Sequence, residues 1–365
     1  MKEKNVNIIT YHICKSTGVG GVERLIRHIQ SLDFKKKYNI TEVYNDIYAS
    51  SSEVSHAYTI VKYCKLHSGQ QGNIFSKLFE RLSVYFYFSK NKYKNDIIFL
   101  FHPEHLLLIP KGTLKDNRII LIQTNKFSKL FERFGKYAFE SRMKYIDYLS
   151  VYTENDFEYV KKYYPTVTDR TKIIPRGCRI PTGNSKKCIN YRLVTICRID
   201  ENQKNLSSMI RIVKNLPEEY TLDVYGVGHQ NEISFLMDSI GEDTDRIRYL
   251  GEAKNIEDIL SQYSLFLMTS NYEGFGQTLI EARSQGLPIV AFNTFDALSW
   301  IVKDGYNGRV IGNKDEELFR MAIIDILSDE EKFYSYSKGA IEMADSTEIS
   351  TVSNLLIDMI DSCTH

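Results

Sequence analysis

Short apolar runs alternate with helix-length segments along the second half of the chain, from Arg192 onward. The runs are LVTIC, YTLDVYG, IRYLG, SLFLMTS and LPIVAF. Strands that alternate with helices in this way are typical of βαβ units, which build parallel sheets. Gly286 and Pro288 end one helical segment and begin the strand LPIVAF, so the local turn residues agree with this interpretation.

The first half is expected to form a second α/β domain, because strand-like runs recur there between longer helical segments. These runs are NVNIITY, IIFLF, RIILIQ and YLSVYT. A linker is expected near residues 176–190, where the regular pattern is interrupted by Pro175, Gly177, Pro181 and Gly183. The sequence therefore predicts an N-terminal domain at 1–180, a C-terminal domain at 181–346, and a final helix at 347–365 that packs back toward the N-terminal domain.

The segment FSKLFER occurs at residues 75–81 and again at 127–133. In each copy, apolar side chains recur at helical spacing, which gives one apolar stripe opposite a face with Lys and Arg. We expect two ordinary helices that pack this stripe into the core. The alternative is an interfacial helix whose aromatic side chains enter the headgroup region of a membrane, while anionic lipid contacts Lys77, Arg81, Lys129, Arg133 and Lys136.

The composition is that of a folded protein, with 365 residues, 43% hydrophobic and 25% charged. Polar side chains interrupt the longest apolar stretch, at 97–110, so we expect no membrane-spanning segment. The N-terminal residues MKEKNVNIITYH lack the features of a secretory signal, which indicates a cytoplasmic protein. The six cysteines form no C-x-x-C pair, so free thiols are expected rather than disulfides or a zinc site.

The net charge of +1 conceals an uneven distribution of charge along the chain. Residues 1–180 carry 30 Lys and Arg against 17 Asp and Glu, whereas residues 181–365 carry 17 against 29. A strongly basic half favours phosphates, nucleic acid or an anionic membrane surface. Because no nucleic-acid-binding module accompanies it, we do not expect nucleic acid as the partner.

The segment SNYEGFGQTLIEARSQGLPIVAF carries the clearest candidate chemistry. An apolar strand leads into a loop with Gly274 and Gly276, and a helix is expected to begin at about Gln277. The first amide groups of a helix and its dipole favour a phosphate, and glycines allow a ligand to approach the backbone. Glu273 and Glu281 flank this position, and carboxylates suit the vicinal hydroxyls of a sugar or ribose. The segment therefore predicts a nucleotide-sugar site.

The run EGFGQTLIEA resembles the E-x7-E motif of the retaining GT-B glycosyltransferases, specifically glycosyltransferase family 4. The later runs GLPIVAF and DGYNGRVI, and the earlier runs ICRIDENQKN, VYGVGH and GVGGVERL, also resemble this family in order and spacing. The likeness is strong over residues 190–312 and looser before them. It implies a GT-B fold, that is, two Rossmann-like α/β domains whose parallel sheets face each other across a cleft.

The resemblance also implies roles for particular residues of this sequence. Glu281 would bind the ribose hydroxyls, and Glu273 the hydroxyls of the donor sugar. Arg198 and Lys204 would neutralise the diphosphate and support the leaving group, so that the implied catalytic set is Glu273, Arg198 and Lys204. The remaining donor-binding residues would be Gly274, Phe275, Gly276, Gln277, Thr278, Gly226, Gly20 and Gly21.

The sequence departs from the family pattern at several positions. The family often has a histidine after the strand that corresponds to RIILIQTN, whereas this chain has Gln123, Thr124 and Asn125. His102, Gln123 and Asn125 are therefore the candidates for the acceptor or sugar side. The linker has the sequence IPRG instead of the usual IPNG, and NTFDA replaces the glycines that commonly follow LPIVAF, so the sugar pocket is expected to differ.

The implied enzyme moves a hexose or N-acetylhexosamine from a nucleotide sugar, most often a UDP sugar in the resembled family, to a hydroxyl of a glycan. A lipid-linked acceptor in bacterial-type surface polysaccharide assembly is expected, on the inner face of the cytoplasmic membrane. The resemblance implies no metal and no cofactor, and the D-x-D run at 243–245 is expected to be a polar turn. The main alternative is an inactive GT-B subunit that acts as a scaffold. Two further alternatives are weaker. A GT-B epimerase or phosphorylase should lack the E-x7-E loop in this form, and a dinucleotide-dependent oxidoreductase based on Gly18-x-Gly20 would need a third glycine where this chain has Glu23.

Overall fold

A computed structural model of the chain describes residues 6–18, 20–32, 38–45, 61–67, 74–183 and 188–364. Part of the expected linker, residues 184–187, lies outside this range, as do the side chains of Ser128 and Lys129. The chain divides into two compact units. Unit 1 comprises Met1–Pro175 and Val352–His365, and unit 2 comprises Arg176–Thr351.

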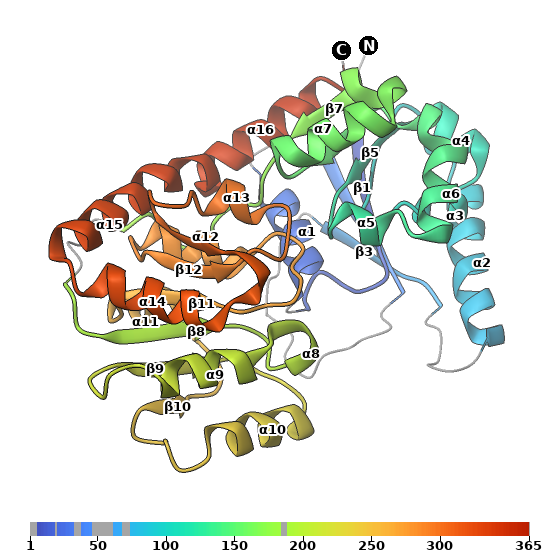
Figure 1. The fold of residues 1–365 in the computed structure, drawn as a ribbon. Coiled ribbons are helices and arrows are strands. Elements are labelled where there is room, and N and C mark those ends of the chain that lie inside the picture. Colours follow the sequence, from blue (N-terminus) through green and yellow to red (C-terminus); the bar gives the residue numbers. More distant parts are fainter. Residues whose placement is uncertain are drawn as a thin grey trace. The chain divides into compact units, whose positions relative to one another are not determined.

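Unit 1 is built on a parallel sheet, whose strands among the described residues follow the order β3-β2-β1-β4-β5-β6-β7 (Figure 1). The strands are β1 (Val6–His12), β2 (Tyr38–Tyr44), β3 (Val61–Lys65), β4 (Ile97–Leu100), β5 (Arg118–Ile122), β6 (Tyr148–Val151) and β7 (Thr171–Ile173). The central register pairs Ile8 with Ile40 on one side and with Ile97 on the other. Because all these pairs are parallel, each connection must cross over the sheet, and the helices are placed on its faces.

Helices cover both faces of this sheet, as the burial of successive strand residues shows. Ile8 packs in one apolar cluster with α1 and α16, whereas Ile9 packs in another with α2 to α7. The C-terminal helix α16 contributes Val352, Leu356 and Met359 to the first cluster. The helices are α1 (Gly21–Ser31), α2 (Ile74–Lys90), α3 (His105–Leu108), α4 (Lys111–Asp116), α5 (Phe127–Leu130), α6 (Arg133–Arg142), α7 (Glu154–Tyr163) and α16 (Ile349–Asp361).

Unit 2 has its own parallel sheet, in the order β10-β9-β8-β11-β12-β13. The strands are β8 (Arg192–Ile196), β9 (Thr221–Tyr225), β10 (Ile247–Tyr249), β11 (Leu265–Met268), β12 (Ile289–Phe292) and β13 (Gly308–Ile311). All residues of β11 and β12 are buried, as expected for central strands covered on both faces. The helices are α8 (Glu201–Lys204), α9 (Leu206–Lys214), α10 (Gln230–Ile240), α11 (Ile256–Ser261), α12 (Gln277–Ser284), α13 (Leu298–Ile301), α14 (Glu316–Leu327) and α15 (Glu330–Ala344).

Local sequence explains where several of these helices begin. The side chains of Asp315 and Asp329 accept hydrogen bonds from the third residues of α14 and α15, and each helix has two acidic residues in its first turn. Such caps satisfy amide groups that have no partner within the helix. The side chain of Thr153 caps α7 in the same way.

The prediction of two α/β domains with parallel sheets is confirmed, and each strand-like run named above contains a strand. Three strands of unit 1, namely β2, β3 and β7, were not predicted. In β2 the side chain of Glu42 is buried, so this strand lacks the apolar pattern of a central strand. Its carboxylate accepts hydrogen bonds from Ser16 and Gln30. These bonds take the place of the hydrogen bonds that water would make to it.

The two FSKLFER segments occupy different environments, which corrects the expectation that both pack into the core. In α2, Phe75, Leu78 and Phe79 are 74, 53 and 61% exposed. The second copy is not one helix, because α5 ends at Leu130 and α6 begins only at Arg133, which has a φ of 27°. Its apolar residues are buried in the core of unit 1, namely Phe127, Leu130 and Phe131.

The cysteines are free thiols, as expected from their spacing. No helix within the described ranges combines the length and apolar character needed to cross a bilayer. Among the same residues, no group of His, Cys, Asp and Glu has an arrangement that could hold a metal ion. Asp243, from the D-x-D run, instead pairs with Lys214 at 2.9 Å.

Candidate functional site

The loop after β11 and the beginning of α12 form the centre of the candidate site in unit 2. The helix begins at Gln277, as predicted, and its preceding residue Gly276 has a φ of 94°. A Cβ atom at Gly276 would approach side-chain atoms of Leu279, Phe295 and Ile301 at 3.2–3.3 Å, so the packing is tight, and the positive φ favours glycine here. The opening amides of such a helix are suited to binding a phosphate.

The other residues of the expected phosphate cradle lie around this turn. Phe275 is 2% exposed, and its ring packs 5.9 Å from that of Trp300, so only its backbone could face a ligand. Gly274, Gln277 and Thr278 are half-buried.

Glu273 and Lys204 are brought together as a nearly buried ion pair. The Lys204 ammonium donates to Oε1 of Glu273 at 2.5 Å, and their side chains are 12% and 11% exposed. The Ser270 hydroxyl donates to the same oxygen at 2.8 Å. Both charged residues are predicted from the sequence to belong to one site, and the structure places them in direct contact.

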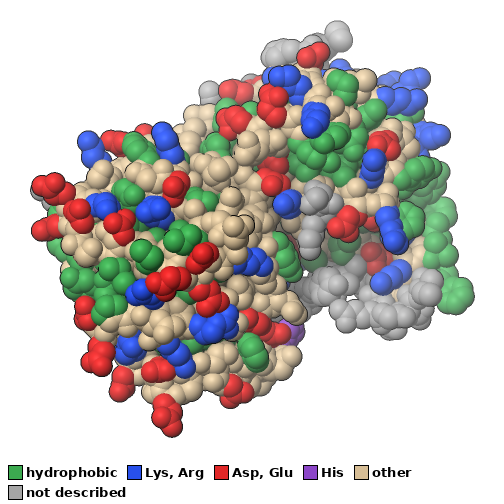
Figure 2. All heavy atoms as spheres, in the orientation of Figure 1, with side chains coloured by type: hydrophobic (Ala, Val, Ile, Leu, Met, Phe, Trp, Pro, Cys, Tyr) green, Lys and Arg blue, Asp and Glu red, His purple; other side chains and the backbone are tan. Residues whose placement is uncertain are grey.

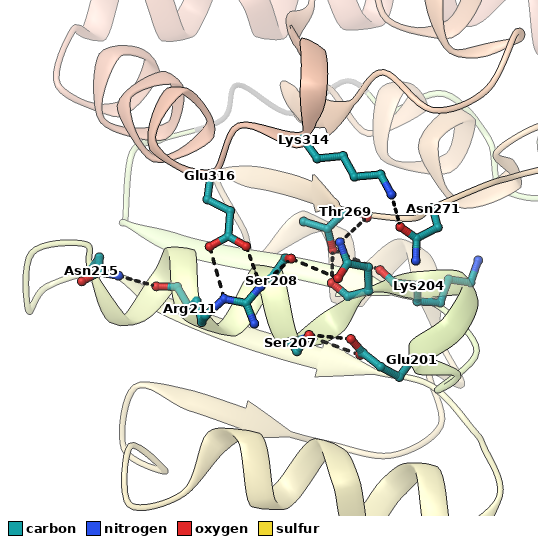
Figure 3. Close-up of polar contacts among 11 residues, drawn as sticks. Glu201, Lys204, Ser207, Ser208, Arg211, Asn215, Thr269, Asn271, Lys314 and Glu316 are labelled. Carbon is teal, nitrogen blue, oxygen red and sulfur yellow. Dashed lines mark hydrogen bonds and ion pairs between the residues drawn. The ribbon is translucent and has the colours of Figure 1, made fainter.

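A polar network fixes the chain segment that carries Lys204 (Figure 3). The Thr269 hydroxyl, at the end of β11, contacts the carbonyl oxygens of Lys204 and Asn205 at 3.1 and 2.9 Å. Asn205 has a left-handed conformation between α8 and α9, and its side-chain oxygen accepts from Ser208 at 3.0 Å. Asn271 extends this network, because its backbone amide donates to the Gln203 carbonyl at 2.7 Å. Lys204 therefore lies on a segment that is bonded directly to the loop of Glu273.

Arg198 is linked to the same loop through Gln203. Its guanidinium donates to the side-chain oxygen of Gln203, and the amide of Gln203 donates to the Tyr272 carbonyl at 3.3 Å. The Arg198 side chain is 63% exposed and also lies 3.6 Å from Asp200. It is thus a solvent-accessible cation beside the buried Lys204–Glu273 pair.

Glu281 lies on α12 and is completely buried. Arg179, from the segment before β8, forms a two-pronged ion pair with it: Nε donates to Oε1 and Nη2 to Oε2, the latter at 2.6 Å. The Gln277 amide donates to Oε1 at 3.3 Å and to the Gly177 carbonyl at 3.0 Å. The sequence pattern does not reveal Arg179, because this contact joins residues 102 positions apart.

Gly226 follows β9, and its lack of a side chain serves the packing of two strand ends. A Cβ atom there would lie 1.7 Å from the carbonyl oxygen of Cys197, the residue before Arg198. The structure therefore explains this glycine by the close approach of two backbones.

In unit 1, Gly20 caps the N-terminus of α1, which begins at Gly21. A Cβ atom at Gly20 would approach the flexible carboxylate end of Glu23 at 2.2 Å, so a small shift of Glu23 could accommodate it. The loop before this helix is fixed by the buried Glu42, whose carboxylate accepts from the amide and the hydroxyl of Ser16, both at 2.6 Å. Glu42 is a second contributor that the sequence pattern did not reveal.

His102 belongs to a histidine cluster at the carboxyl ends of β1 and β4. The His102 and His105 rings are 5.9 Å apart, and the His12 and His105 rings 6.4 Å. Burial lowers the pKa of all three imidazoles, and His105, the most buried, also faces the other two. The cluster therefore provides neutral imidazoles. Of its three histidines, only His102 was a candidate from the sequence.

The other sugar-side candidates differ in their accessibility. Gln123 is 3% exposed, and its amide donates to Asp156 at 3.1 Å while its oxygen accepts from the Tyr152 amide at 3.0 Å. These bonds give Gln123 a role in joining β6 and α7 to β5. Asn125 is exposed, and its side chain accepts from the Lys126 amide at 2.8 Å.

Comparisons with known proteins show which proteins this chain resembles. Residues 190–329 match the family model described as Glycosyl transferases group 1. The UDP-N-acetylglucosamine–peptide N-acetylglucosaminyltransferase GtfA subunit of Streptococcus pneumoniae serotype 4 is 27% identical over 206 residues, which are 53% of this chain and 40% of that protein. The chain thus matches less than half the length of this relative.

A second relative matches over most of both chains. It is the GalNAc-alpha-(1->4)-GalNAc-alpha-(1->3)-diNAcBac-PP-undecaprenol alpha-1,4-N-acetyl-D-galactosaminyltransferase of Campylobacter jejuni, which is 23% identical over 82% of this chain and 84% of its own. The crystal structure of the pneumococcal O-GlcNAc transferase GtfA with UDP and GlcNAc matches 99% of each chain, with a TM-score of 0.76 and 13% identity. The chain therefore has a GT-B fold, and its residues 190–329 are similar to the group 1 glycosyl transferases.

Proposed function

We propose that the protein is a retaining glycosyltransferase that transfers a hexose or N-acetylhexosamine from a UDP sugar to a hydroxyl of a glycan. The observation that carries this proposal is the nearly buried Lys204–Glu273 pair, directly before the helix that carries the buried Glu281. A cation, a helix N-terminus and two carboxylates suit a diphosphate flanked by two sugars.

Each charged group would have a distinct task in the reaction. Lys204 and Arg198 would stabilise the negative charge that develops on the departing diphosphate, a task for which fixed cations are effective. Glu273 would accept hydrogen bonds from hydroxyls of the donor sugar, and Glu281 from those of the ribose. With these cations present, we propose that the transfer needs no metal ion.

The retaining reaction would proceed on one face of the donor sugar. The bond between the anomeric carbon and the phosphate oxygen breaks while the acceptor oxygen bonds to that carbon. The proton of the acceptor hydroxyl passes to the departing phosphate oxygen, so the step needs no separate protein base. The protein contributes orientation and charge stabilisation.

Binding and transfer can be tested separately. A thermal-shift screen with UDP, GDP and ADP sugars identifies the donor, because a bound ligand raises the unfolding temperature by mass action. Single-turnover sugar transfer is then measured for Glu273→Gln and Arg198→Gln, with Arg248→Ala as a control from the same unit. We expect strong loss of transfer in the first two only, and unimpaired transfer in both would refute the assignment.

The names of the relatives describe transferases and do not favour the inactive scaffold as an alternative. The assay that separates the two is donor hydrolysis without acceptor. Slow release of free sugar from the donor supports an active enzyme, whereas nucleotide-sugar binding without hydrolysis or transfer would support a scaffold.

We further propose a lipid-linked acceptor at the inner face of the cytoplasmic membrane. The name of the Campylobacter jejuni relative includes a PP-undecaprenol acceptor. In this chain, α2 exposes an apolar face beside Lys77 and Arg81, and Figure 2 shows hydrophobic and basic side chains together over this region. A helix with exposed aromatic residues and basic neighbours is suited to an anionic membrane surface.

Co-sedimentation with vesicles, with and without anionic lipid, tests this proposal. The wild type is expected to pellet with anionic vesicles at low salt and to be released at high salt, because screening weakens surface attraction. The double substitution Phe75→Ser and Phe79→Ser should abolish pelleting, whereas Phe235→Ser, which alters an exposed aromatic residue of unit 2, should not. No pelleting of the wild type at low salt would contradict the proposal.

A further inference from the structure

Arg179 has an unusual relation to the candidate ribose-binding carboxylate. It is 28% exposed, yet its guanidinium contacts both oxygens of a glutamate that is completely buried. Removing a carboxylate from water costs several kcal/mol unless a partner compensates for it. The Arg179 guanidinium is the cation that compensates Glu281 in this way.

The segment that carries Arg179 is fixed against α12 and its neighbours. On one side, the Gln277 amide holds the Gly177 carbonyl at 3.0 Å. On the other, the amide of Gln285 donates to the Pro181 carbonyl at 2.8 Å. The backbone amide of Cys178, next to Arg179, donates to Thr347 at 2.7 Å. The arginine therefore lies on a preorganised segment, and its two-pronged contact is geometrically defined.

The lone pairs of Glu281 indicate how a ligand could bind there. Each carboxylate oxygen can accept about two hydrogen bonds. Oε1 accepts from Arg179 and from Gln277, whereas Oε2 accepts from Arg179. A vicinal diol needs one acceptor site on each oxygen, so one existing donor to Oε1 must leave. The neutral amide of Gln277, at 3.3 Å, is a weaker partner than the charged guanidinium.

We propose that Arg179 is a positioning residue of the nucleoside site, which holds the Glu281 carboxylate in orientation while the ribose diol replaces the Gln277 amide. This inference rests on the proposed function, because it takes Glu281 to be the ribose ligand. Arg179 need not touch the nucleotide. It acts through Glu281, by occupying one lone pair on each oxygen and leaving the second for the two ribose hydroxyls.

UDP binding measured by calorimetry tests the proposal, with wild-type protein and the variants Arg179→Ala, Arg179→Lys and Glu281→Gln. Arg179→Ala should weaken UDP binding by about tenfold. The loss of one hydrogen bond between a ribose hydroxyl and the charged carboxylate lowers the affinity by about that factor. Arg179→Lys retains the positive charge but not the two-pronged contact of the guanidinium, so an intermediate loss of UDP affinity is expected. Arg248→Ala is the matched control, because Arg248 makes the same two-pronged contact with the buried Asp223, at 2.7 and 2.8 Å.

The dependence of UDP binding on pH separates positioning from a general loss of structure. Without its guanidinium partner, a fully buried carboxylate tends to take up a proton, which removes acceptor sites. The terminal phosphate of UDP also titrates in this range, so the affinity of Arg179→Ala is expressed relative to that of the wild type at each pH. This ratio should rise as the pH increases from about 5.5 to about 8.5. Adding Glu281→Gln to Arg179→Ala should remove this pH dependence, because the titrating group is gone.

The possible outcomes are distinct. If the wild type binds none of UDP, GDP and ADP, the proposed function fails. If the wild type binds UDP but Arg179→Ala binds it equally well and with the same pH profile, the positioning role is refuted while the proposed function stands. Tighter binding by Arg179→Ala would also refute it, because Arg179 would then compete with the ribose. If Arg248→Ala is as strongly destabilised as Arg179→Ala but binds UDP normally, reduced protein stability does not explain the weaker UDP binding of Arg179→Ala.

Discussion

The Lys204–Glu273 ion pair permits a quantitative test by a double-mutant cycle. At a separation of 2.5 Å and an effective dielectric constant of about 20, the Coulomb attraction is about 7 kcal/mol. The desolvation cost of each charge cancels in the cycle, and screening by solvent around the partly exposed side chains reduces the measured coupling free energy to about 1–3 kcal/mol. Lys204→Met alone is expected to lower the free energy of unfolding by about 3 kcal/mol, because it leaves a buried carboxylate without its cation. Glu273→Gln and the double variant complete the cycle.

Tryptophan fluorescence during urea unfolding is the appropriate assay. The chain has a single tryptophan, Trp300, which lies in unit 2 and packs 5.9 Å from Phe275, so its emission reports on the unit that contains the pair. A second cycle, with Arg211→Met and Glu316→Gln, is the control, since that pair is 55% and 36% exposed (Figure 3). Exposed pairs contribute about 0.5 kcal/mol. A Lys204–Glu273 coupling no larger than this control would refute the argument that the pair is a desolvated one.

Three further predictions follow from buried or strained positions. Gly276→Ala should lower the free energy of unfolding by about 2 kcal/mol in urea titrations, because its φ of 94° disfavours a side chain; an unchanged midpoint would contradict this. Arg283→Ala should cost about 3 kcal/mol, since this fully buried side chain, whose pKa burial lowers to about 10, bonds Thr347 at 2.8 Å. Burial lowers the pKa of His105, so the unfolded chain binds its proton more readily and stability should fall as the pH drops below about 6.5. His105→Phe should make this decline shallower, and equal slopes for variant and wild type would show that His105 does not contribute.

The sequence was sufficient for the fold class because the central strands are apolar on both faces. Runs such as SLFLMTS and LPIVAF are buried throughout. When helices alternate with such runs, a parallel α/β sheet is one of few fold classes that fit the pattern. The strand Tyr38–Tyr44 was missed for a physical reason. Its Glu42 is buried and compensated by Ser16 and Gln30, which lie in distant segments, so a polar position in the sequence became a core position in the fold.

Part of the candidate site could be predicted because it is local. The loop glycine, the helix start and the two glutamates lie within one short segment, and their spacing alone places them around one helix turn. The partners of the glutamates could not be predicted in the same way. Lys204 lies 69 positions from Glu273 and Arg179 lies 102 from Glu281, and only the packing of separate segments brings them together.

The FSKLFER segments show why an amphipathic pattern does not by itself decide which side of a helix is buried. In α2, Val84 and Phe88 already anchor the helix in the core of unit 1, at 0 and 1% exposure. The stripe with Phe75 and Phe79 lies on the exposed part of the helix, so α2 has more apolar surface than its own unit covers. In the second copy the helix ends at Leu130, and the corresponding residues Phe127 and Phe131 lie in the core. The sequence thus specifies apolar stripes, whereas the fold decides that one stripe stabilises unit 1 and that the other stays exposed, which is the stripe that we propose contacts a membrane.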